Sequence, residues 1–510
     1  MDLSAVGIQS SFRILDWGIV AVYLIGIVAV GVYIKRYISN VTDFIVAGRG
    51  LKIFLGIATM IGTELGLVTV MYSAQKGFTG GFAAFHIALA SAITALVVGL
   101  TGFIVVPLRK MKVMTIPEFY ERRFGHGVRI LGGTILALSG ILNMGMFLKA
   151  GSIFVMGITG MTEDIHLKII MTALLVMVLL YTALGGMVSV VVSDYIQFVL
   201  LSVSLVATCV LSIKSLGWHN IIETVSALKG QAGFDPFDAE GFGASYVIWM
   251  FFLGLVSCAV WQTAVIRACS MESVRSVKRL YVWSSVGFLI RNLLPFFLGI
   301  SAFVYMADDP SLKSIFLPEG ADADPQVTLM AMPVFLSRLL PAGLLGIVAA
   351  GMLAAFMSTH DSYLLCWSSV LTQDVVAPCF KNGLSSKARL LLTRVFIVTI
   401  GIFILVWGLW YDLGQDLWDY MAISGAIYFT GAIALLIFGL YWKRASKVGA
   451  YLSLTSGFGA VVGLKPVQTA LGIEVSSAIV GLVVIALAVA LMVAGSLLYP
   501  DRNKPSDYKE

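Results

Sequence analysis

The sequence predicts an all-α integral membrane protein with about 13 transmembrane helices. Of its 510 residues, 59% are hydrophobic and only 12% are charged, whereas a soluble globular protein carries about 25% charged residues. Apolar runs long enough to cross a bilayer, which takes about 20 helical residues, recur from 17–34 to 479–498. We therefore expect a single transmembrane domain over residues 1–510, a lipid bilayer around it, and no nucleic-acid partner.

The expected spans follow one another with short connections. Each satisfies the length that a membrane-crossing helix needs. They cover residues 14–35, 53–75, 81–108, 128–158, 167–186, 188–213, 243–270, 278–306, 328–358, 388–411, 416–441, 446–464 and 475–498.

Charge in the connections predicts the orientation, because Lys and Arg are enriched in cytoplasmic loops. Alternate connections are basic, and they lie near residues 35–52, 109–123, 275–279, 381–389 and 443–447. The opposite connections are acidic or mixed, near 235–240, 308–324 and 412–419. We expect a multi-pass protein of a plasma membrane, such as a bacterial inner membrane. Its N-terminus would lie outside and its C-terminus in the cytoplasm.

Two expected spans contain segments that disturb a regular helix. Residues 62–66 place two glycines and a carboxylate inside the second span, and residues 254–262 interrupt the seventh. These spans are five apart, which is the offset of an inverted repeat whose first helices are broken near the bilayer midplane. The alternative is that the glycines only allow close helix contacts. Spacing alone leaves both interpretations open.

A polar stripe on the ninth span is the first candidate for an ion site. Ala355, Ser358, Thr359 and Ser362 are spaced to share one helix face, and Asp361 lies beside them. Hydroxyl and carbonyl oxygens suit a hard monovalent cation. Ser and Thr also bond back to their own helix, which is the structural alternative. A carboxylate within a span favours a functional interpretation, because it is costly in lipid.

Other ionisable residues are expected at membrane depth. They are Glu64 in the first broken segment, Lys149 in the fourth span, Asp194 in the sixth and Arg291 in the eighth. Each needs a partner or water. Glu64 and Lys149 either form an ion pair that fixes packing or face a solute, and we interpret Arg291 as part of a structural ion pair.

Five motifs in order resemble the sodium:solute symporter family, which includes proline, pantothenate, sialic acid and sodium/glucose transporters. Any one motif is weak evidence alone, but together they cover nearly the whole chain. The motifs are DFIVAGR (43–49), TIPEF with RRFG (115–125), YTALGG with SDYIQ (181–197), LLG with MSTHDS (344–362) and LYWKRA (440–445).

The resemblance implies the fold of the bacterial leucine transporter, built from two inverted five-helix repeats with broken first and sixth core helices. The leading helix would be 14–35, and the first repeat would cover 53–213. The second repeat would cover 243–441, followed by two C-terminal helices in 446–498.

The resemblance also implies a sodium site between the first and eighth core helices. Its matching ligands are the Ala355 carbonyl and the hydroxyls of Ser358 and Thr359. The broken helix would add two carbonyls three residues apart, for which Ile61 and Glu64 are the expected pair, with a register that could slip by one.

Some members bind a second sodium ion, and the residues that match its ligands here are Asp194, Asp361 and Ser362. The candidate solute contacts lie beside the broken helices: Thr63, Glu64, Asn143, Lys149 and Gln262. Glu64 stands where many members have a neutral residue, and Lys149 has no general counterpart. A carboxylate and an ammonium together would suit a zwitterion or a polar organic acid.

The function that we expect is sodium-coupled symport of a small polar organic solute, an amino acid, a carboxylate or a sugar-like molecule, into the cytoplasm by alternating access. A proton-coupled or uncoupled carrier of the same fold is the alternative, and a membrane sensor is a lesser one. No catalytic constellation supports an enzyme. The oligomeric state is left open.

Overall fold

The computed structural model describes residues 10–34, 50–161, 163–239, 241–319, 323–380, 383–411 and 414–501. Within these ranges the chain is helical, with a single isolated β-bridge between Leu51 and Met271. The motif at 43–49 and the tail 502–510 lie outside the described residues, as do the side chains of 183–193. The expectations that rest on them therefore stay predictions.

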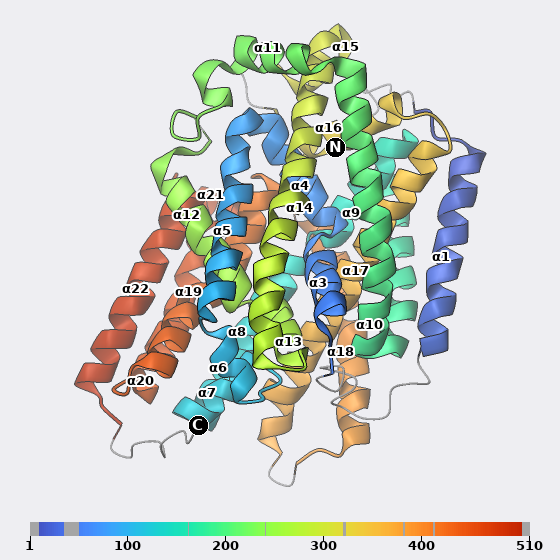
Figure 1. Cartoon of the computed structure of the whole chain (residues 1–510). Coiled ribbons are helices and arrows are strands. Elements are labelled where there is room, and N and C mark those ends of the chain that lie inside the picture. The colour runs from blue at the N-terminus through green and yellow to red at the C-terminus, as the bar shows by residue number, and fades with distance from the viewer. Residues whose placement is uncertain are drawn as a thin grey trace.

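The first half of the described chain forms helices on several sides of the molecule (Figure 1). They are α1 (Ile14–Ile34), α3 (Ile53–Glu64), α4 (Leu67–Gly80), α5 (Phe85–Thr101), α6 (Val105–Lys110), α7 (Ile116–Phe124), α8 (His126–Met144), α9 (Phe147–Thr159), α10 (Asp164–Leu216) and α11 (Trp218–Lys229).

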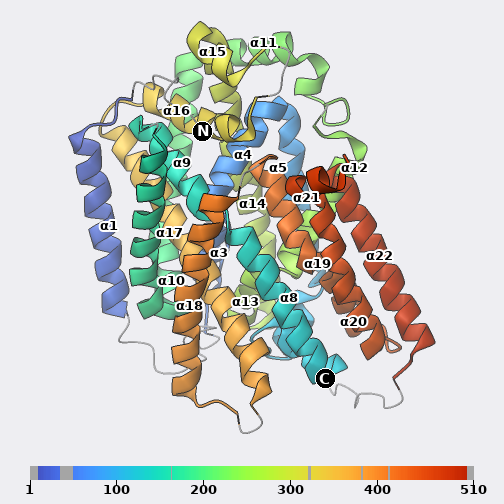
Figure 2. The same cartoon turned by 180° about the vertical axis from the view of Figure 1, so that it is seen from behind.

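The second half completes the bundle, and Figure 2 shows α18 and α19 near α8 on the reverse side. Its helices are α12 (Gly243–Ala259), α13 (Gln262–Ser270), α14 (Val274–Asp308), α15 (Pro310–Phe316), α16 (Pro325–Leu339), α17 (Leu344–Val370), α18 (Ser386–Trp410), α19 (Leu417–Tyr441), α20 (Lys447–Ser456), α21 (Lys465–Leu471) and α22 (Ser477–Leu498).

Eight helical segments of the described chain are long and apolar enough to cross a membrane, or nine if the bent pair α12–α13 is one span. This count is lower than the 13 spans expected. Several expected spans are divided or short in the structure. The span 53–75 is split into α3 and α4, and the stretch 446–464 is α20 followed by a 3₁₀ segment.

The expected single span 328–358 is wrong. The structure ends α16 at Leu339 and begins α17 at Leu344, with Pro341 and Gly343 between them. Proline interrupts a helix because it lacks an N–H, and Gly343 takes a φ of 86° that other residues avoid. As a result the polar stripe at 355–362 lies in the buried middle of α17 rather than at the end of a span.

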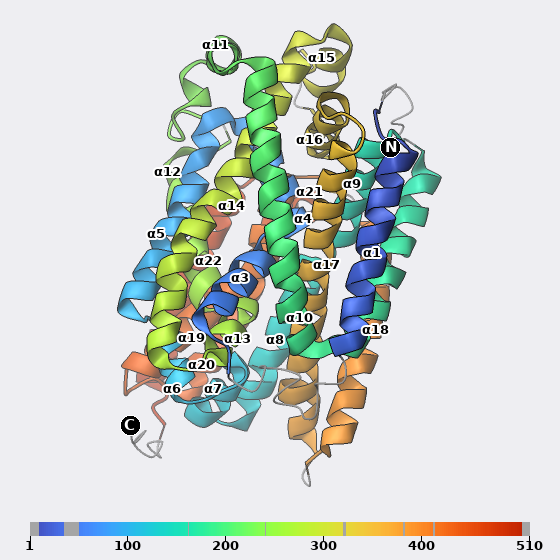
Figure 3. The same ribbon diagram turned by 45° about the vertical axis from the view of Figure 1, so that its right-hand side comes forward.

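Both interrupted segments are breaks between two helices. α3 and α4 are separated by Leu65 and Gly66, and α12 and α13 are bent by 41° at a break of two residues. α3 packs against α10 and α17, and the three lie next to one another in Figure 3. The first break therefore faces the helix that carries the polar stripe.

The two faces of the bundle carry different connections. Figure 1 shows α11 and α15 at the top and the short helices α6 and α7 at the bottom. The bottom connection, 109–123, is basic, and the top connections near 235–238 and 308–309 contain aspartates.

α4 and α14 cross so closely that glycine is required on both helices. A Cβ on Gly77 would lie 2.0 Å from the Phe296 carbonyl oxygen, and one on Gly299 would lie 1.8 Å from that of Ala74. Small residues allow such approach between membrane helices. The crossing packs α4, the second half of the broken helix, directly against α14.

We expect Gly299→Ala to destabilise the protein by about 1–3 kcal/mol, because an added methyl group forces the two backbones apart. The measurement is the midpoint of thermal unfolding of the purified protein. Gly26→Ala is the matched control, since a Cβ at Gly26 meets nothing within 4 Å. Equal midpoints for the two variants would contradict this account of the crossing.

Candidate functional site

A buried carboxylate gathers hydroxyl groups where α3, α10 and α17 meet. Asp194 on α10 has no exposed surface. Its Oδ1 accepts a hydrogen bond from Ser358, and its Oδ2 accepts from Thr59 at 2.6 Å and from Thr63 at 3.0 Å. Ser362 joins the group through Thr63, at 3.2 Å between the two hydroxyl oxygens. We call Asp194, Thr59, Thr63, Ser358 and Ser362 the Asp194 cage.

The cage holds the side chain of Arg267, which comes from α13 and is 1% exposed. Arg267 Nη2 lies 3.5 Å from Asp194 Oδ2. The same nitrogen donates to Ser362 at 3.0 Å and to Thr63. Buried charges need partners of opposite sign, so Arg267 pairs with Asp194 within the cage. The sequence analysis did not identify Arg267. Its position inside the expected span 243–270, where a charged side chain is costly, was the signal that could have found it.

Thr359 faces the break between α3 and α4. Its hydroxyl donates to the carbonyl of Ala355 at 3.1 Å and to that of Thr63 at 3.2 Å. A Cβ on Gly66 would lie 1.9 Å from Thr359 Oγ1. The stripe and the broken helix therefore approach each other at one point, with only glycine tolerated there.

The carbonyls at the end of α3 differ in what they already bind. The Ile61 carbonyl accepts from the Leu65 N–H at 2.8 Å, and the Glu64 carbonyl accepts from the Thr69 hydroxyl at 2.8 Å. Leu65 makes the last turn of the helix, so the carbonyls from Gly62 onward lie beyond that ladder. The carbonyls of Ile61 and Glu64 each therefore accept one hydrogen bond and keep a second lone pair.

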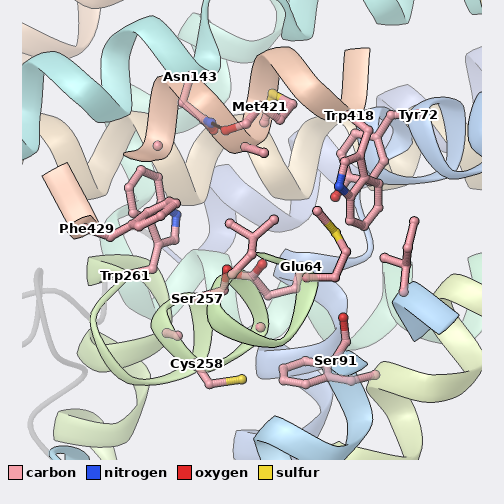
Figure 4. Close-up of a pocket in the computed structure, with 18 of the residues that line it drawn as sticks. Glu64, Tyr72, Ser91, Asn143, Ser257, Cys258, Trp261, Trp418, Met421 and Phe429 are labelled. Carbon is pink, nitrogen blue, oxygen red and sulfur yellow. Dashed lines mark hydrogen bonds between the residues drawn. The ribbon is translucent and has the colours of Figure 1, made fainter. Parts of the chain in front are cut away.

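A cavity lies beside both breaks and is lined by aromatic and polar side chains (Figure 4). Trp418 and Tyr72 stand on one side of it, Trp261 and Phe429 on the other, and Glu64 points between them. The lining residues with polar or aromatic groups are Glu64, Tyr72, Ser91, Asn143, Ser257, Cys258, Trp261, Phe288, Arg291, Tyr363, Trp418 and Phe429.

Glu64 pairs with Arg291 rather than with Lys149. Glu64 Oε2 lies 3.6 Å from Arg291 Nη1, and Glu64 Oε1 accepts from Thr263 at 3.0 Å. The Arg291 guanidinium also sits 4.4 Å from the centre of the Phe288 ring. The ion pair that we expected for Arg291 is present, and it lies at the cavity, which the position of Arg291 in a span did not reveal.

Lys149 lies away from this cavity. Its Nζ donates to the Tyr411 carbonyl at 2.8 Å, and it lines a separate small space with Gln326 and Leu417. The expected ion pair between Glu64 and Lys149 is therefore absent from the described structure. The sequence placed both residues at membrane depth but did not show on which side of its helix each one lies.

The remaining candidates take different positions. Asn143 lines the cavity, where its amide donates to the Met421 carbonyl at 2.7 Å. Gln262 does not line it: its Oε1 accepts from the Ile116 N–H at 2.9 Å, which ties the second break to the bottom connection. Thr63 belongs to the Asp194 cage, and Asp361 is fully buried on α17.

Ion pairs and aromatic rings join α4 to α19 on the α11 side of the cavity. Lys76 Nζ lies 2.7 Å from Asp416 and 2.9 Å from Asp419, and Lys76 is 4% exposed. One turn closer to the cavity, the Tyr72 and Trp418 rings meet edge to face at 4.6 Å. Tyr72 and Trp418 line the cavity, and the Lys76 ion pairs lie one helical turn beyond Tyr72 on α4.

Comparison with known proteins places these features in one family. Residues 44–457 match the model of the sodium:solute symporter family. The chain is 25% identical to the sodium/sialic acid symporter NanT of Aliivibrio fischeri, over 89% of this chain and 88% of that protein. It is 26% identical to the human sodium/myo-inositol cotransporter over 88% of this chain, but it spans only 66% of that protein's length.

The fold is similar to that of a Na⁺-coupled sialic acid symporter solved with substrate in an outward-open state, with a TM-score of 0.80 at 20% identity. That match covers 96% of this chain and 100% of the other. The transporter MhsT, solved with L-phenylalanine, matches with a TM-score of 0.50 at 17% identity, over 85% of this chain and 98% of the other. The family consists of transporters rather than enzymes, with sodium as the coupling ion. The match over most of its length means that this chain belongs to the sodium:solute symporter family.

Proposed function

We propose that this chain is a sodium-coupled symporter that imports a small polar organic solute by alternating access. One observation carries the proposal: the break after α3 borders both the hydroxyl groups of α17 and the cavity. Its backbone meets Thr359 through the Thr63 carbonyl at 3.2 Å, and its Glu64 side chain lines the cavity. An ion bound at the break would therefore affect the shape of the solute site directly.

The sodium ion would lie between α17 and the break. The Ala355 carbonyl and the hydroxyls of Ser358 and Thr359 supply neutral oxygens, which fit a monovalent cation better than a charged cluster would. The Ile61 and Glu64 carbonyls each accept a hydrogen bond at 2.8 Å. The Ala355 carbonyl also accepts one, from Thr359, and a carbonyl has a second lone pair. We therefore propose that two carbonyls of the break complete the site, either those of Ile61 and Glu64 or, one residue later, those of Gly62 and Leu65. Bound there, sodium links α17 to the break.

The solute would bind in the cavity between the aromatic side chains. Glu64 and Arg291 offer one group of each sign, so a zwitterion or a hydroxylated organic acid fits their chemistry. The rings of Trp261, Trp418 and Phe429 provide flat apolar faces, as small-molecule sites commonly do. Asn143 adds an amide near the opposite wall. Lys149 and Gln262 leave the set of proposed solute contacts because neither lines the cavity.

The basic connections support an orientation of the protein in the membrane. The face that carries α6 and α7 would be cytoplasmic, and the face that carries α11 would be outside. Moving one charge inward across 100 mV contributes about 2.3 kcal/mol, which supports roughly fifty-fold accumulation. The two breaks would belong to inverted repeats over 53–213 and 243–441, within a fold of about 13 spans.

Sodium should raise the thermal stability of the purified protein and support uptake into proteoliposomes, whereas choline should do neither. A ligand that binds only the folded state stabilises it. Thr359→Ala should raise the sodium concentration needed for half-maximal uptake by at least about tenfold, which corresponds to about 1.4 kcal/mol. Ser358→Ala should also raise it, although this variant removes a donor to Asp194 as well. Equal uptake in sodium and choline would favour an uncoupled or proton-coupled carrier.

A thermal-shift screen in sodium should identify the solute among amino acids, sugar acids, polyols and monocarboxylates. We expect Glu64→Gln and Arg291→Gln each to weaken binding of that solute by about 1–3 kcal/mol, since each leaves a buried charged partner unpaired. Lys149→Met is the matched control and should leave the affinity nearly unchanged. A loss of affinity in Lys149→Met alone would place the solute elsewhere.

Lys76→Met should open the cavity toward the α11 face, because it leaves Asp416 and Asp419 without their cation. Cys258 lines the cavity and reports on this opening. In a Cys379→Ser background, which removes the exposed thiol, a hydrophilic maleimide should label Cys258 faster in the Lys76→Met variant. Adding Cys258→Ser should abolish the increase. An unchanged labelling rate would show that the ion pairs do not hold the cavity closed.

A further inference from the structure

The Asp194 cage contains Asp194 and Ser362, two of the three residues that the family resemblance suggested for a second sodium ion, and the guanidinium of Arg267 lies among them. We propose that the Arg267 guanidinium fills this cage as a built-in cation, so that the protein binds one sodium ion rather than two. The inference rests on the sodium site proposed above and concerns how many ions that mechanism uses.

The contacts of one nitrogen carry the proposal. Arg267 Nη2 donates to Ser362 Oγ at 3.0 Å and to Thr63 Oγ1, and it lies 3.5 Å from Asp194 Oδ2. These are three of the oxygens with which the cage could bind a sodium ion. Because one position cannot hold both groups, a second sodium would have to displace the arginine from all three partners.

Arg267 is anchored at its other nitrogens as well. Nη1 donates to the Thr263 carbonyl on its own helix at 2.9 Å, and Nε donates to the carbonyl and the hydroxyl of Thr59, each at 3.2 Å. The guanidinium therefore bridges α13, α3 and α17, with all three of its nitrogens donating hydrogen bonds. Arginine does not lose its proton in proteins, so the cage holds a permanent positive charge.

Both carboxylate oxygens of the cage already have partners. Asp194 Oδ1 accepts from Ser358, and Oδ2 is shared by Thr59, Thr63 and Arg267. A neutral pair in a buried site gives a further cation no net attraction, whereas an unpaired carboxylate there would recruit one. Removing the guanidinium should thus convert the cage into a cation site.

Equilibrium binding of radioactive sodium to the purified protein tests the proposal, with choline chloride keeping the ionic strength constant. We expect one sodium per wild-type chain, two per Arg267→Gln chain with a steeper sodium dependence, and one per Arg267→Lys chain, in which a cation remains. The double variant Asp194→Asn/Arg267→Gln should return to one, since its cage has no carboxylate to attract the ion.

Two sodium ions in the wild type would overturn the inference and leave the symport proposal intact, whereas no bound sodium would overturn the symport proposal itself. A folded Arg267→Gln protein that binds one sodium would also refute the inference. If that variant is unstable, its thermal midpoint in graded sodium decides: stabilisation beyond that of the wild type supports a new cation site, and an equal response refutes it.

Discussion

The interruption at Leu65 and Gly66 is the constraint on which the rest of this structure depends. Lipid offers no hydrogen bonds, so a broken helix at membrane depth must find partners for its backbone within the protein. Here the hydroxyls of Thr69 and Thr359 bind the Glu64 and Thr63 carbonyls. The break therefore requires a buried polar helix beside it, and α17 is that helix.

Buried ion pairs lie along both halves of the broken helix, α3 and α4. The Asp194–Arg267 pair lies against α3, Glu64 pairs with Arg291 of α14, and Lys76 of α4 pairs with Asp416 and Asp419. Burying such pairs is rarely a gain in stability over apolar packing. Two of the pairs join the broken helix directly to α14 and α19, and the third, between α10 and α13, contacts Thr59 and Thr63 of α3. Any movement of α3 and α4 would have to break or carry these contacts.

Much of this arrangement could be predicted from the sequence. Glycines and a carboxylate within an apolar run indicated the region of the first break, and helical spacing grouped Ser358, Thr359 and Ser362. Those patterns are local, and local geometry depends on few residues. The sequence also showed that Glu64, Lys149 and Arg291 lie at membrane depth, because depth follows from distance along a span.

What could not be predicted is how the helices are rotated against one another. Rotation decides that Glu64 meets Arg291 while Lys149 turns toward the Tyr411 carbonyl, and it depends on packing among segments far apart in the chain. The extent of α17 was missed for a related reason. The apolar pattern of α17 continues across Gly343 and Pro341 into α16. Hydropathy alone therefore predicted one span where the structure has two helices.

The contact between Gly66 and Thr359 has an evolutionary consequence. A side chain at position 66 would occupy the place of the Thr359 hydroxyl, 1.9 Å from the new Cβ, so position 66 is not free to vary while Thr359 is kept. A lineage that changed its coupling ion by replacing Thr359 with a smaller residue would at the same time remove the clash that requires glycine at position 66. Ion choice and backbone shape would then diverge together, through paired rather than single substitutions.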